Sequence, residues 1–427
     1  MEAFDQLRGI IGIAVLLAIA WGLSEDRRQR LSWKWIAGAL ALQGVLAFVI
    51  LRVPFVWDLM EFANLGVRAI EQATLEGSSY MFGYLGGAPL PFELKEGLDP
   101  PLVIAFQILP LVIVFSALAA LLWHWGLLKA AVNGLSFLLR RTLGVSGVVG
   151  LSGGANMFLG VVESPLVVRA YFARVSRAEL FQIMVLAMAT ISGAILILYA
   201  TTLRDTVPQA VGHMITASLV SLPAALLIAK LMVPETSTAE AEKDKPQDVD
   251  EPGLKYEGSI DAIVKGTMDG MQLFLAVVAV IIVVFAFVAL TDQMLALLPL
   301  VGDEPLSLKR LFGWIFAPLM WLIGVPWSEA QAAGGLMGTK AVLNEYVAYL
   351  ELAALPDGTF APRSLLIVTY ALCGVANLAS VGLLVSTIGT LCPERRAETA
   401  GLGMKSWIAG NMATAITGAW VGLLTWA

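Results

Sequence analysis

The sequence predicts an all-α polytopic membrane protein, and three observations carry this prediction. Hydrophobic residues make up 58% of the 427 positions, charged residues make up only 14%, and the mean hydropathy is +0.80. Soluble domains carry about 25% charged residues, so a soluble globule of this composition would leave too much apolar surface in water. Several uncharged segments also approach the roughly 20 residues that a helix needs to cross a bilayer.

Composition and charge exclude several other classes of protein. The two cysteines, Cys373 and Cys392, are too few for a disulfide scaffold and are better explained as small packing residues. The net charge of −6 argues against a nucleic-acid partner. Residues 234–258 carry eight acidic and three lysine side chains, so most of the net charge lies in this stretch. We expect it to be a solvated linker between two halves of the chain.

Uncharged apolar segments predict about eight spanning helices. They occupy residues 10–23, 35–50, 101–128, 180–203, 206–229, 271–290, 364–392 and 406–427. Two further apolar stretches have a different pattern. Residues 142–162 contain six glycines, and residues 311–328 contain two prolines before a glycine-rich run. We expect these two to form re-entrant helical hairpins, because interrupted backbone at membrane depth needs surrounding protein or a cavity.

The basic residues predict the orientation of the chain. They cluster at residues 27–34, 140–177 and 395–396. If the N-terminus lies outside and both interrupted stretches return to the side they enter from, all three clusters fall inside. This agrees with the positive-inside rule, whereas two full crossings would split the clusters. We therefore expect a multi-pass protein of the cytoplasmic (inner) membrane with its N-terminus outside.

Each half of the chain repeats the same order of features. A broken, glycine-rich stretch ends in an acid, Glu163 in the first half and Glu345 in the second. A long apolar run follows, with a small or polar cluster at residues 189–193 and 371–377, and then another span. Three crossings separate the two hairpins, which therefore enter from opposite faces. This order is typical of inverted-repeat secondary transporters, whose binding site lies at the repeat interface near mid-membrane.

Polar residues inside these segments are candidate binding residues, because placing them in a membrane is costly. Glu163 and the pair Asn344 and Glu345 follow the two broken stretches, and Asn377 and Ser380 lie three apart in a later span. Carboxylates and amides in broken helices suit a ligand rich in hydroxyls together with a small cation.

Structural roles for the same residues stay open at this point. Glu345 could form an ion pair with Lys340, and Asn377 and Ser380 could form hydrogen bonds between helices. The amide of Asn377 and the hydroxyl of Ser380 would lie on one helical face if the helix continues through both residues.

Other functions fit the sequence less well. The LSGG string at residues 151–154 occurs without any G-x-x-x-x-G-K-[ST] motif to bind phosphates. His124 and His213 have no carboxylates at ligand spacing, so we expect interfacial or packed histidines and no metal centre. A channel would share the hydropathy without needing acids after two symmetric breaks, and a membrane transferase would show an Asp-rich metal cluster. We expect no enzymatic activity and no organic cofactor.

Four motifs between about residue 145 and the C-terminus carry a family resemblance. The most specific is G-x-K-x-x-x-N-E-[FY]-V-A-[YF] at residues 338–349, and the others are G-x-x-E-[SA]-P at 160–165, A-L-C-G-x-A-N at 371–377 and P-E-R-R at 393–396. Together they resemble the concentrative nucleoside transporter family, which includes the bacterial nucleoside permeases.

The resemblance implies a membrane-embedded homotrimer that imports nucleosides with a coupling cation by an elevator-like movement. It also implies that each protomer has a scaffold and a mobile transport domain. We accordingly expect scaffold helices and an interfacial helix at 1–128, the first transport repeat at 129–233, an acidic cytoplasmic linker with an interfacial helix at 234–270, a scaffold or trimer-contact helix at 271–300, and the second transport repeat at 301–427.

Positions that match the family motifs imply a substrate site. Glu345 and Asn377 would bind the ribose hydroxyls, Asn344 and Ser380 would lie beside them, and Glu163 would lie near the base, directly or through water.

The same resemblance implies a sodium site. It would use the side chains of Asn156 and Thr190 and the backbone carbonyls of Leu159 and Ile191. These side chains carry the oxygens that Na⁺ needs, which favours sodium as the coupling ion, with proton coupling as the alternative.

The chain departs from the family pattern where the base is read. Val161 and Val162 replace the usual Gln and Thr or Ser, and Val375 replaces an aromatic residue. The valines lack the amide and hydroxyl that would form hydrogen bonds to the edge of a pyrimidine, and they lack a ring on which the base could stack. Apolar pockets discriminate weakly between ligands. We expect that uridine is not favoured and that the substrate is a bulkier nucleoside or, alternatively, another hydroxyl-rich glycoside.

Overall fold

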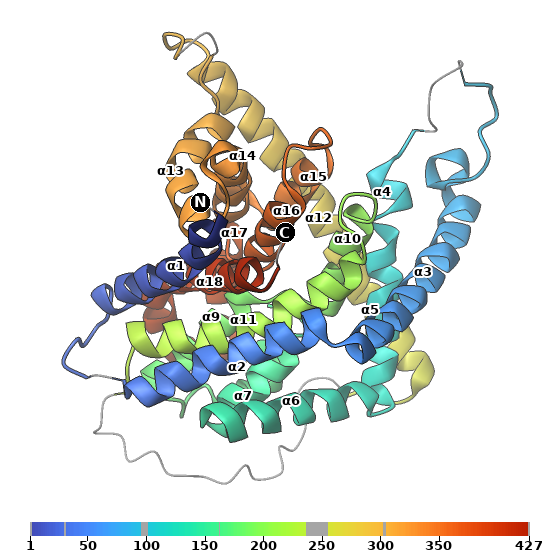
Figure 1. Ribbon diagram of the computed structural model, residues 1–427. Helices are drawn as coiled ribbons and strands as arrows, with labels where there is room; N and C mark the ends of the chain where they lie inside the picture. Colours follow the sequence, from blue (N-terminus) through green and yellow to red (C-terminus); the bar gives the residue numbers. More distant parts are fainter. Residues whose placement is uncertain are drawn as a thin grey trace.

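The computed structural model describes residues 2–29, 31–94, 101–161, 163–235, 255–301 and 305–425. Within these ranges the regular elements are all helices, as the sequence predicted. Figure 1 shows them as one bundle of long, broken and short helices. Val162 and most of the acidic linker lie outside the described residues.

Long helices form the N-terminal part of the chain. Val53 is extended because it precedes Pro54, and this proline then occupies the first turn of α3, where its missing N–H costs nothing. The elements are α1 (Glu2–Gly22), α2 (Trp33–Arg52), α3 (Pro54–Phe82), η1 (Gly83–Gly86), α4 (Ile104–Gln107) and α5 (Pro110–His124).

The first repeat contains two interruptions. The chain leaves helix between α7 and α8, before Glu163, and again at Thr190 between α9 and α10. A capping box between Ser176 and Glu179 fixes the start of α9. The elements are α6 (Leu127–Leu143), α7 (Gly147–Asn156), α8 (Glu163–Val167), η2 (Arg169–Tyr171), α9 (Arg177–Ala189), α10 (Gly193–Thr202) and α11 (Ala210–Met232).

The second repeat follows the long helix α12 (Ser259–Leu295) and has the same order of interruptions. Helix α13 (Leu308–Leu322) meets the following helical segment at a bend of 118°. Breaks come before Glu345 and between α16 and α17. The remaining elements are α14 (Trp327–Gly338), the π turn η3 (Thr339–Leu343), α15 (Glu345–Ala353), α16 (Pro362–Leu372), α17 (Leu378–Leu391), η4 (Pro393–Arg395) and α18 (Arg396–Leu424).

The arrangement of the two repeats agrees with the inverted order expected from the sequence. Helices α6 and α7 lie at one end of the bundle, and α13 and α14 lie at the opposite end (Figure 1). Each of these pairs packs closely, and each leads into a break that ends in an acid.

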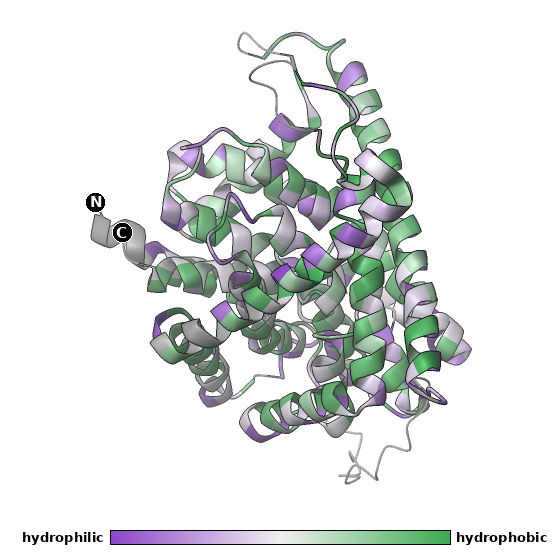
Figure 2. Ribbon diagram, turned by 90° about the vertical axis from the view of Figure 1, so that its right-hand side faces the viewer, coloured by the Kyte–Doolittle hydropathy of each residue, from purple (hydrophilic) through white to green (hydrophobic). Residues whose placement is uncertain are grey.

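Among the described residues, six helices are long and apolar enough to cross a membrane, and the bent pair starting at α13 would make a seventh if it were one span. The apolar part of α1 and helix α17 are shorter apolar helices. The expected count of about eight spans therefore remains a prediction. Figure 2 shows hydrophobic residues along the outer faces of the bundle, as a lipid-facing surface requires.

Two packing units can be distinguished. Helix α12 packs along α5, where Gly266 and Gly270 allow close approach: a Cβ on Gly266 would lie 2.7 Å from Ala120 Cβ, and one on Gly270 would lie 2.7 Å from Ile113 Cα. Helices α1 and α2 instead pack mainly against α11 and α18, in the densely buried part of the molecule. This buried part contains both broken runs.

Candidate functional site

Glu345 lies at the point where two broken helical runs meet. It is the first residue of α15, separated from the π turn by Asn344, and is only 4% exposed. Its Oε1 accepts a hydrogen bond of 2.6 Å from the hydroxyl of Tyr199, and its Oε2 accepts one of 2.6 Å from Nδ2 of Asn377. The carboxylate therefore has a donor on each oxygen, one from α10 and one from the break before α17.

Asn377 is held by its role as the N-cap of α17. Its Oδ1 accepts from the backbone N–H of Ser380 at 2.8 Å, so its amide N–H₂ group must point the other way, toward Glu345. The helix does not continue through this segment, because residues 373–376 form the break. Asn377 and Ser380 are thus joined by capping rather than by a shared helical face.

Asn344 caps the next helix in the same manner. Its side chain accepts from the backbone N–H of Tyr346 at 2.7 Å. This bond begins α15 at Glu345 and places the acid in the first turn, where the helix N-terminus stabilises a negative charge. Asn344 therefore positions Glu345 whether or not it touches a substrate.

Lys340 does not form the ion pair that was one possible structural role for Glu345. This lysine is fully buried, and its Nζ donates to Oδ1 of Asn411 at 2.8 Å and to Oγ1 of Thr414 at 3.0 Å. Asn411 in turn donates to the carbonyl of Ala376, next to Asn377. The ammonium group thus braces the α16–α17 break through α18.

The sequence interpretation assigned no role to a cluster of three tyrosines, one of which contacts Glu345. Tyr199 stacks on Tyr346 with ring centroids 5.6 Å apart and is tilted against Tyr349 at 5.0 Å. The hydroxyl of Tyr349 donates to the carbonyl of Thr369 at 2.9 Å. A buried phenol usually has a partner for its hydroxyl, so a tyrosine in an apolar run is a signal that could have drawn attention to Tyr199.

Two of the candidate cation residues of the first repeat, Asn156 and Thr190, are brought together. Asn156, at the end of α7, contacts the hydroxyl of Thr190 through Nδ2 and donates to the carbonyl of Leu186 at 3.1 Å. Its Oδ1 accepts from the hydroxyl of Ser164 at 3.0 Å. Asn156, Thr190, Ser164 and the Leu186 carbonyl therefore form one hydrogen-bonded cluster, whose uncharged oxygens are of the type that a small hard cation prefers.

Ser164 and the Leu186 carbonyl were not among the expected cation ligands. Leu159 and Ile191, whose carbonyls were expected, lie in the two breaks next to Asn156 and Thr190, outside regular helix. Ile191 is held there by its N–H, which donates to the Ser218 hydroxyl at 3.2 Å.

Glu163 is the first residue of α8 and directly follows the break of the first repeat. The chain turns at Gly160, with φ of +123°, and a Cβ there would lie 2.8 Å from Oε2 of Glu163 and 3.2 Å from Cβ of Ser192. Val161 and Val375 are both partly buried and pack against the main apolar cluster. The expectation for Val162 falls on a residue outside the described ranges.

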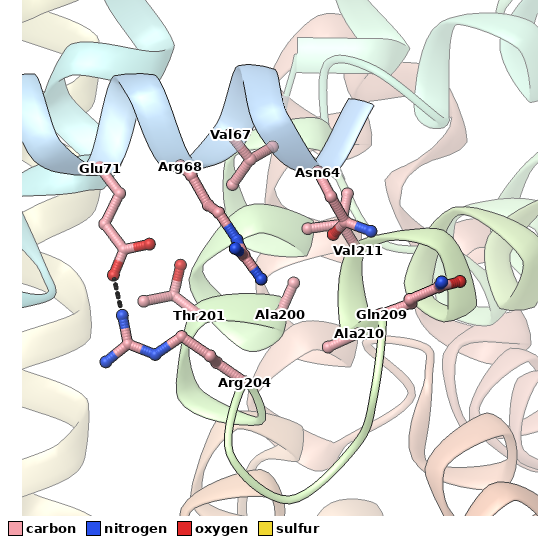
Figure 3. A pocket seen from close by; sticks show the side chains of 10 residues that line it. All are labelled: Asn64, Val67, Arg68, Glu71, Ala200, Thr201, Arg204, Gln209, Ala210 and Val211. Carbon is pink, nitrogen blue, oxygen red and sulfur yellow. Dashed lines mark hydrogen bonds and ion pairs between the residues drawn. The ribbon is translucent and has the colours of Figure 1, made fainter. Parts of the chain in front are cut away.

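A small cavity of about 40 Å³ lies away from these residues. Figure 3 shows it between α3, which contributes Arg68 and Glu71, and the α10–α11 segment, which contributes Arg204. Ligand pockets generally measure about 300 Å³ or more, so this cavity is too small for a nucleoside. None of the site residues expected from the sequence lines it.

The geometry can therefore do two things. The ionisable Glu345 and the amide of Asn377 can accept and donate hydrogen bonds to neighbouring hydroxyls of a ligand, and the oxygens around Asn156 can hold a small cation in the adjoining break. Both positions lie at interruptions of helices, and Glu345, Asn377, Asn156 and Thr190 are themselves buried.

Comparison with known proteins identifies the family of the chain. Residues 213–422 and 11–85 match the family models described as the C-terminus and N-terminus of the Na⁺ dependent nucleoside transporter, and residues 105–206 match one described as Gate, nucleoside recognition. The uncharacterized transporter YutK of Bacillus subtilis is 33% identical over 98% of this chain and 99% of its own length.

Further relatives have functional names. Nucleoside permease NupC of Helicobacter pylori is 31% identical over 98% of this chain and 99% of its own length. The solved structure of CNTnw in an inward-facing substrate-bound state is 34% identical, covers 98% of both chains and gives a TM-score of 0.84. The chain thus belongs to the concentrative nucleoside transporter family, whose members are Na⁺-dependent membrane transporters and not enzymes.

Proposed function

We propose that this protein imports nucleosides together with sodium across the cytoplasmic membrane. The observation that carries the proposal is the contact between Asn377 and Glu345, each in a different helix break and both buried. A paired amide and carboxylate offers one donor and one acceptor side by side, which matches the two adjacent hydroxyls of a ribose. The family membership and the names of the relatives support the same substrate class.

Sodium is the coupling ion that the donor set favours. The cluster of Asn156, Thr190, Ser164 and the Leu186 carbonyl offers only uncharged oxygens. No carboxylate participates in these contacts, so the cluster itself offers no group that titrates near neutral pH. Proton coupling is the alternative, and it would have to use Glu345 or Glu163. Replacing sodium with choline tests this alternative.

The base pocket of this chain is expected to be apolar. Val161 and Val375 pack against the hydrophobic cluster and bring no hydrogen-bonding side chain to the base. A site without polar contacts loses little when the base changes, so we propose weak discrimination and no preference for uridine. A different hydroxyl-rich glycoside remains the second candidate, since the Glu345–Asn377 pair recognises hydroxyls rather than a base.

Packing supports an elevator-like division of the molecule. Helices α5 and α12 form a close pair, whereas α1 and α2 pack with α11 and α18. We propose that α5 and α12 belong to the static scaffold and trimer contact, and that α1 and α2 move with the transport repeats. This places the boundary inside the expected scaffold segment 1–128. The proposed orientation has the N-terminus outside.

Thermal stability of the purified protein in detergent tests the proposal. Ligands that bind only the native state raise the melting temperature by mass action. Nucleosides and other glycosides are added in sodium or in choline at equal ionic strength. A shift by nucleosides that requires sodium is expected, and a shift by another glycoside alone would favour the second candidate.

Variants connect any shift to the proposed site. Glu345→Gln and Asn377→Ala should each abolish the nucleoside-dependent shift, because each removes a group that contacts the hydroxyls. Glu351→Gln is the matched control, since Glu351 lies on the same helix but pairs with Lys309. A nucleoside shift that survives in both site variants would disprove the assignment.

A further inference from the structure

The ring cluster beside the candidate site contains a hydroxyl with a role that packing does not explain. Tyr199 is 2% exposed and its ring is already held by Tyr346 and Tyr349. Its hydroxyl nevertheless points at Oε1 of Glu345 and donates a short hydrogen bond of 2.6 Å. Phenylalanine would fill the same space, so the hydroxyl serves the carboxylate rather than the core.

The electrostatics of the pocket make this bond important. Glu345 is buried, and a buried carboxylate is stable as an anion only when donors replace its lost water. The two side-chain donors are Asn377 and Tyr199, one on each oxygen. Asn377 is fixed by its capping bond, so the Tyr199 hydroxyl is the donor that can give way to a ligand hydroxyl.

Other groups around Glu345 do not duplicate this bond. Lys340 on η3 acts only through space, because its ammonium hydrogens go to Asn411 and Thr414. Tyr349 on the same helix donates to a backbone carbonyl, and the Cys373 thiol lies within electrostatic range at the α16–α17 break.

We propose that Tyr199 is a positioning residue that keeps Glu345 ionised and oriented toward the ligand hydroxyls. In the absence of ligand its hydroxyl occupies Oε1, and a substrate hydroxyl competes for the same oxygen. This inference rests on the proposed function, since it assigns Glu345 to hydroxyl recognition. It predicts a pH effect that a merely structural tyrosine would not cause.

The test uses the pH dependence of nucleoside uptake by cells or proteoliposomes that contain the full chain. Loss of one hydrogen bond to a charged group favours protonation of that group by roughly tenfold or more. In Tyr199→Phe the acid limb of the uptake profile should therefore move to higher pH by about one unit or more. Tyr349→Phe, which loses a hydroxyl of the same cluster, should leave the limb where it is in the wild type.

A second variant keeps the test decisive if Tyr199→Phe does not fold. A fluorinated tyrosine at position 199 preserves shape and is a stronger hydrogen-bond donor, so the acid limb should move to lower pH. The inference would be overturned if the acid limb of the uptake profile is unchanged in every position-199 variant that folds. Equal shifts of the limb in Tyr199→Phe and Tyr349→Phe would also overturn it.

The outcome can be separated from failure of the proposed function. If the wild type transports no nucleoside, the proposed function fails, and the inference is then judged on the purified protein. There the melting temperature is measured as a function of pH. Tyr199→Phe alone should change how the melting temperature depends on acid pH. In a chain that already carries Glu345→Gln, adding Tyr199→Phe should cause no further change. An effect that persists in that background would also overturn the inference.

Discussion

At the scale of single residues, recognition depends on side chains whose orientation is fixed by backbone capping. Asn377 and Asn344 each use their oxygen to cap a helix. A cap fixes which end of an amide faces the site, and substitution of a cap generally costs about 1 kcal/mol of stability. The same residues therefore contribute to the fold and to the site. Loss of activity in their variants must be interpreted together with a measurement of stability.

Base selectivity is a prediction at the same scale. Val161→Gln combined with Val375→Phe restores an amide and an aromatic face at the positions where this chain has valine. We expect uridine to give half of its maximal thermal shift at a concentration about tenfold lower than in the wild type, because a polar readout is regained. The response to a bulky purine nucleoside is the internal control and should fall or stay constant. Unchanged uridine affinity would show that these positions do not contact the base.

Elements come next in scale, and here the breaks are the functional parts. Helix α7 ends at Asn156 and α8 begins at Glu163, so the turn between them must place both side chains. Gly160 permits this turn because its φ of +123° is strained for any residue with a Cβ. The added Cβ would also approach the Glu163 carboxylate to 2.8 Å.

Gly160→Ala should therefore lower both stability and ligand response. We expect a cost of about 1–3 kcal/mol for the strained backbone and a smaller nucleoside-dependent thermal shift, since Glu163 must move. Gly134→Ala is the matched control, because Gly134 lies within α6 with open space around its Cβ position and alanine favours helix. Equal melting temperatures for the two variants would contradict this account of the turn.

Much of the element order could be read from the sequence, and the reasons are local. Glycines and prolines mark the interrupted stretches, and the small clusters at residues 189–193 and 371–377 mark the breaks, because each feature acts on its own backbone. The long-range partners could not be read. Tyr199 and Glu345 are 146 residues apart, and Lys340 meets Asn411 across 71 residues. No local pattern encodes which buried donor reaches which acceptor.

At the scale of the whole molecule, contacts between distant segments hold the N-terminal helices to the buried bundle. Glu25, in the loop after α1, accepts from Arg177 at the start of α9 and from Lys405 on α18. Arg177 also pairs with Glu398. The network ties the N-terminal helices to two elements of the buried bundle, in agreement with the proposal that α1 and α2 move with it.

This network predicts a pH dependence with a definite sign. Glu25 accepts a hydrogen bond from Arg177 and pairs with Lys405, and these contacts lower the pKa of Glu25 from 4.5 to about 2. Burial of the carboxyl group opposes this shift but does not cancel it. A carboxyl group with a depressed pKa in the folded state stabilises the protein above its unfolded value, and that contribution is lost as the pH falls from about 4.5 toward 2. Because the side chains are partly exposed, solvent screening reduces the contribution to about 1 kcal/mol.

Glu25→Gln should therefore melt a few degrees below the wild type at pH 7, and the difference should shrink as the pH approaches 3. High salt should shrink it as well, because partly exposed charges are screened. Asp205→Gln is a suitable control, since this acid forms only a long contact of 3.7 Å with Arg204 and is 92% exposed. If the difference in melting temperature between Glu25→Gln and the wild type were the same at pH 7 and pH 3, the loop would be held by packing, and the charge network would contribute nothing to holding the N-terminal helices against the buried bundle.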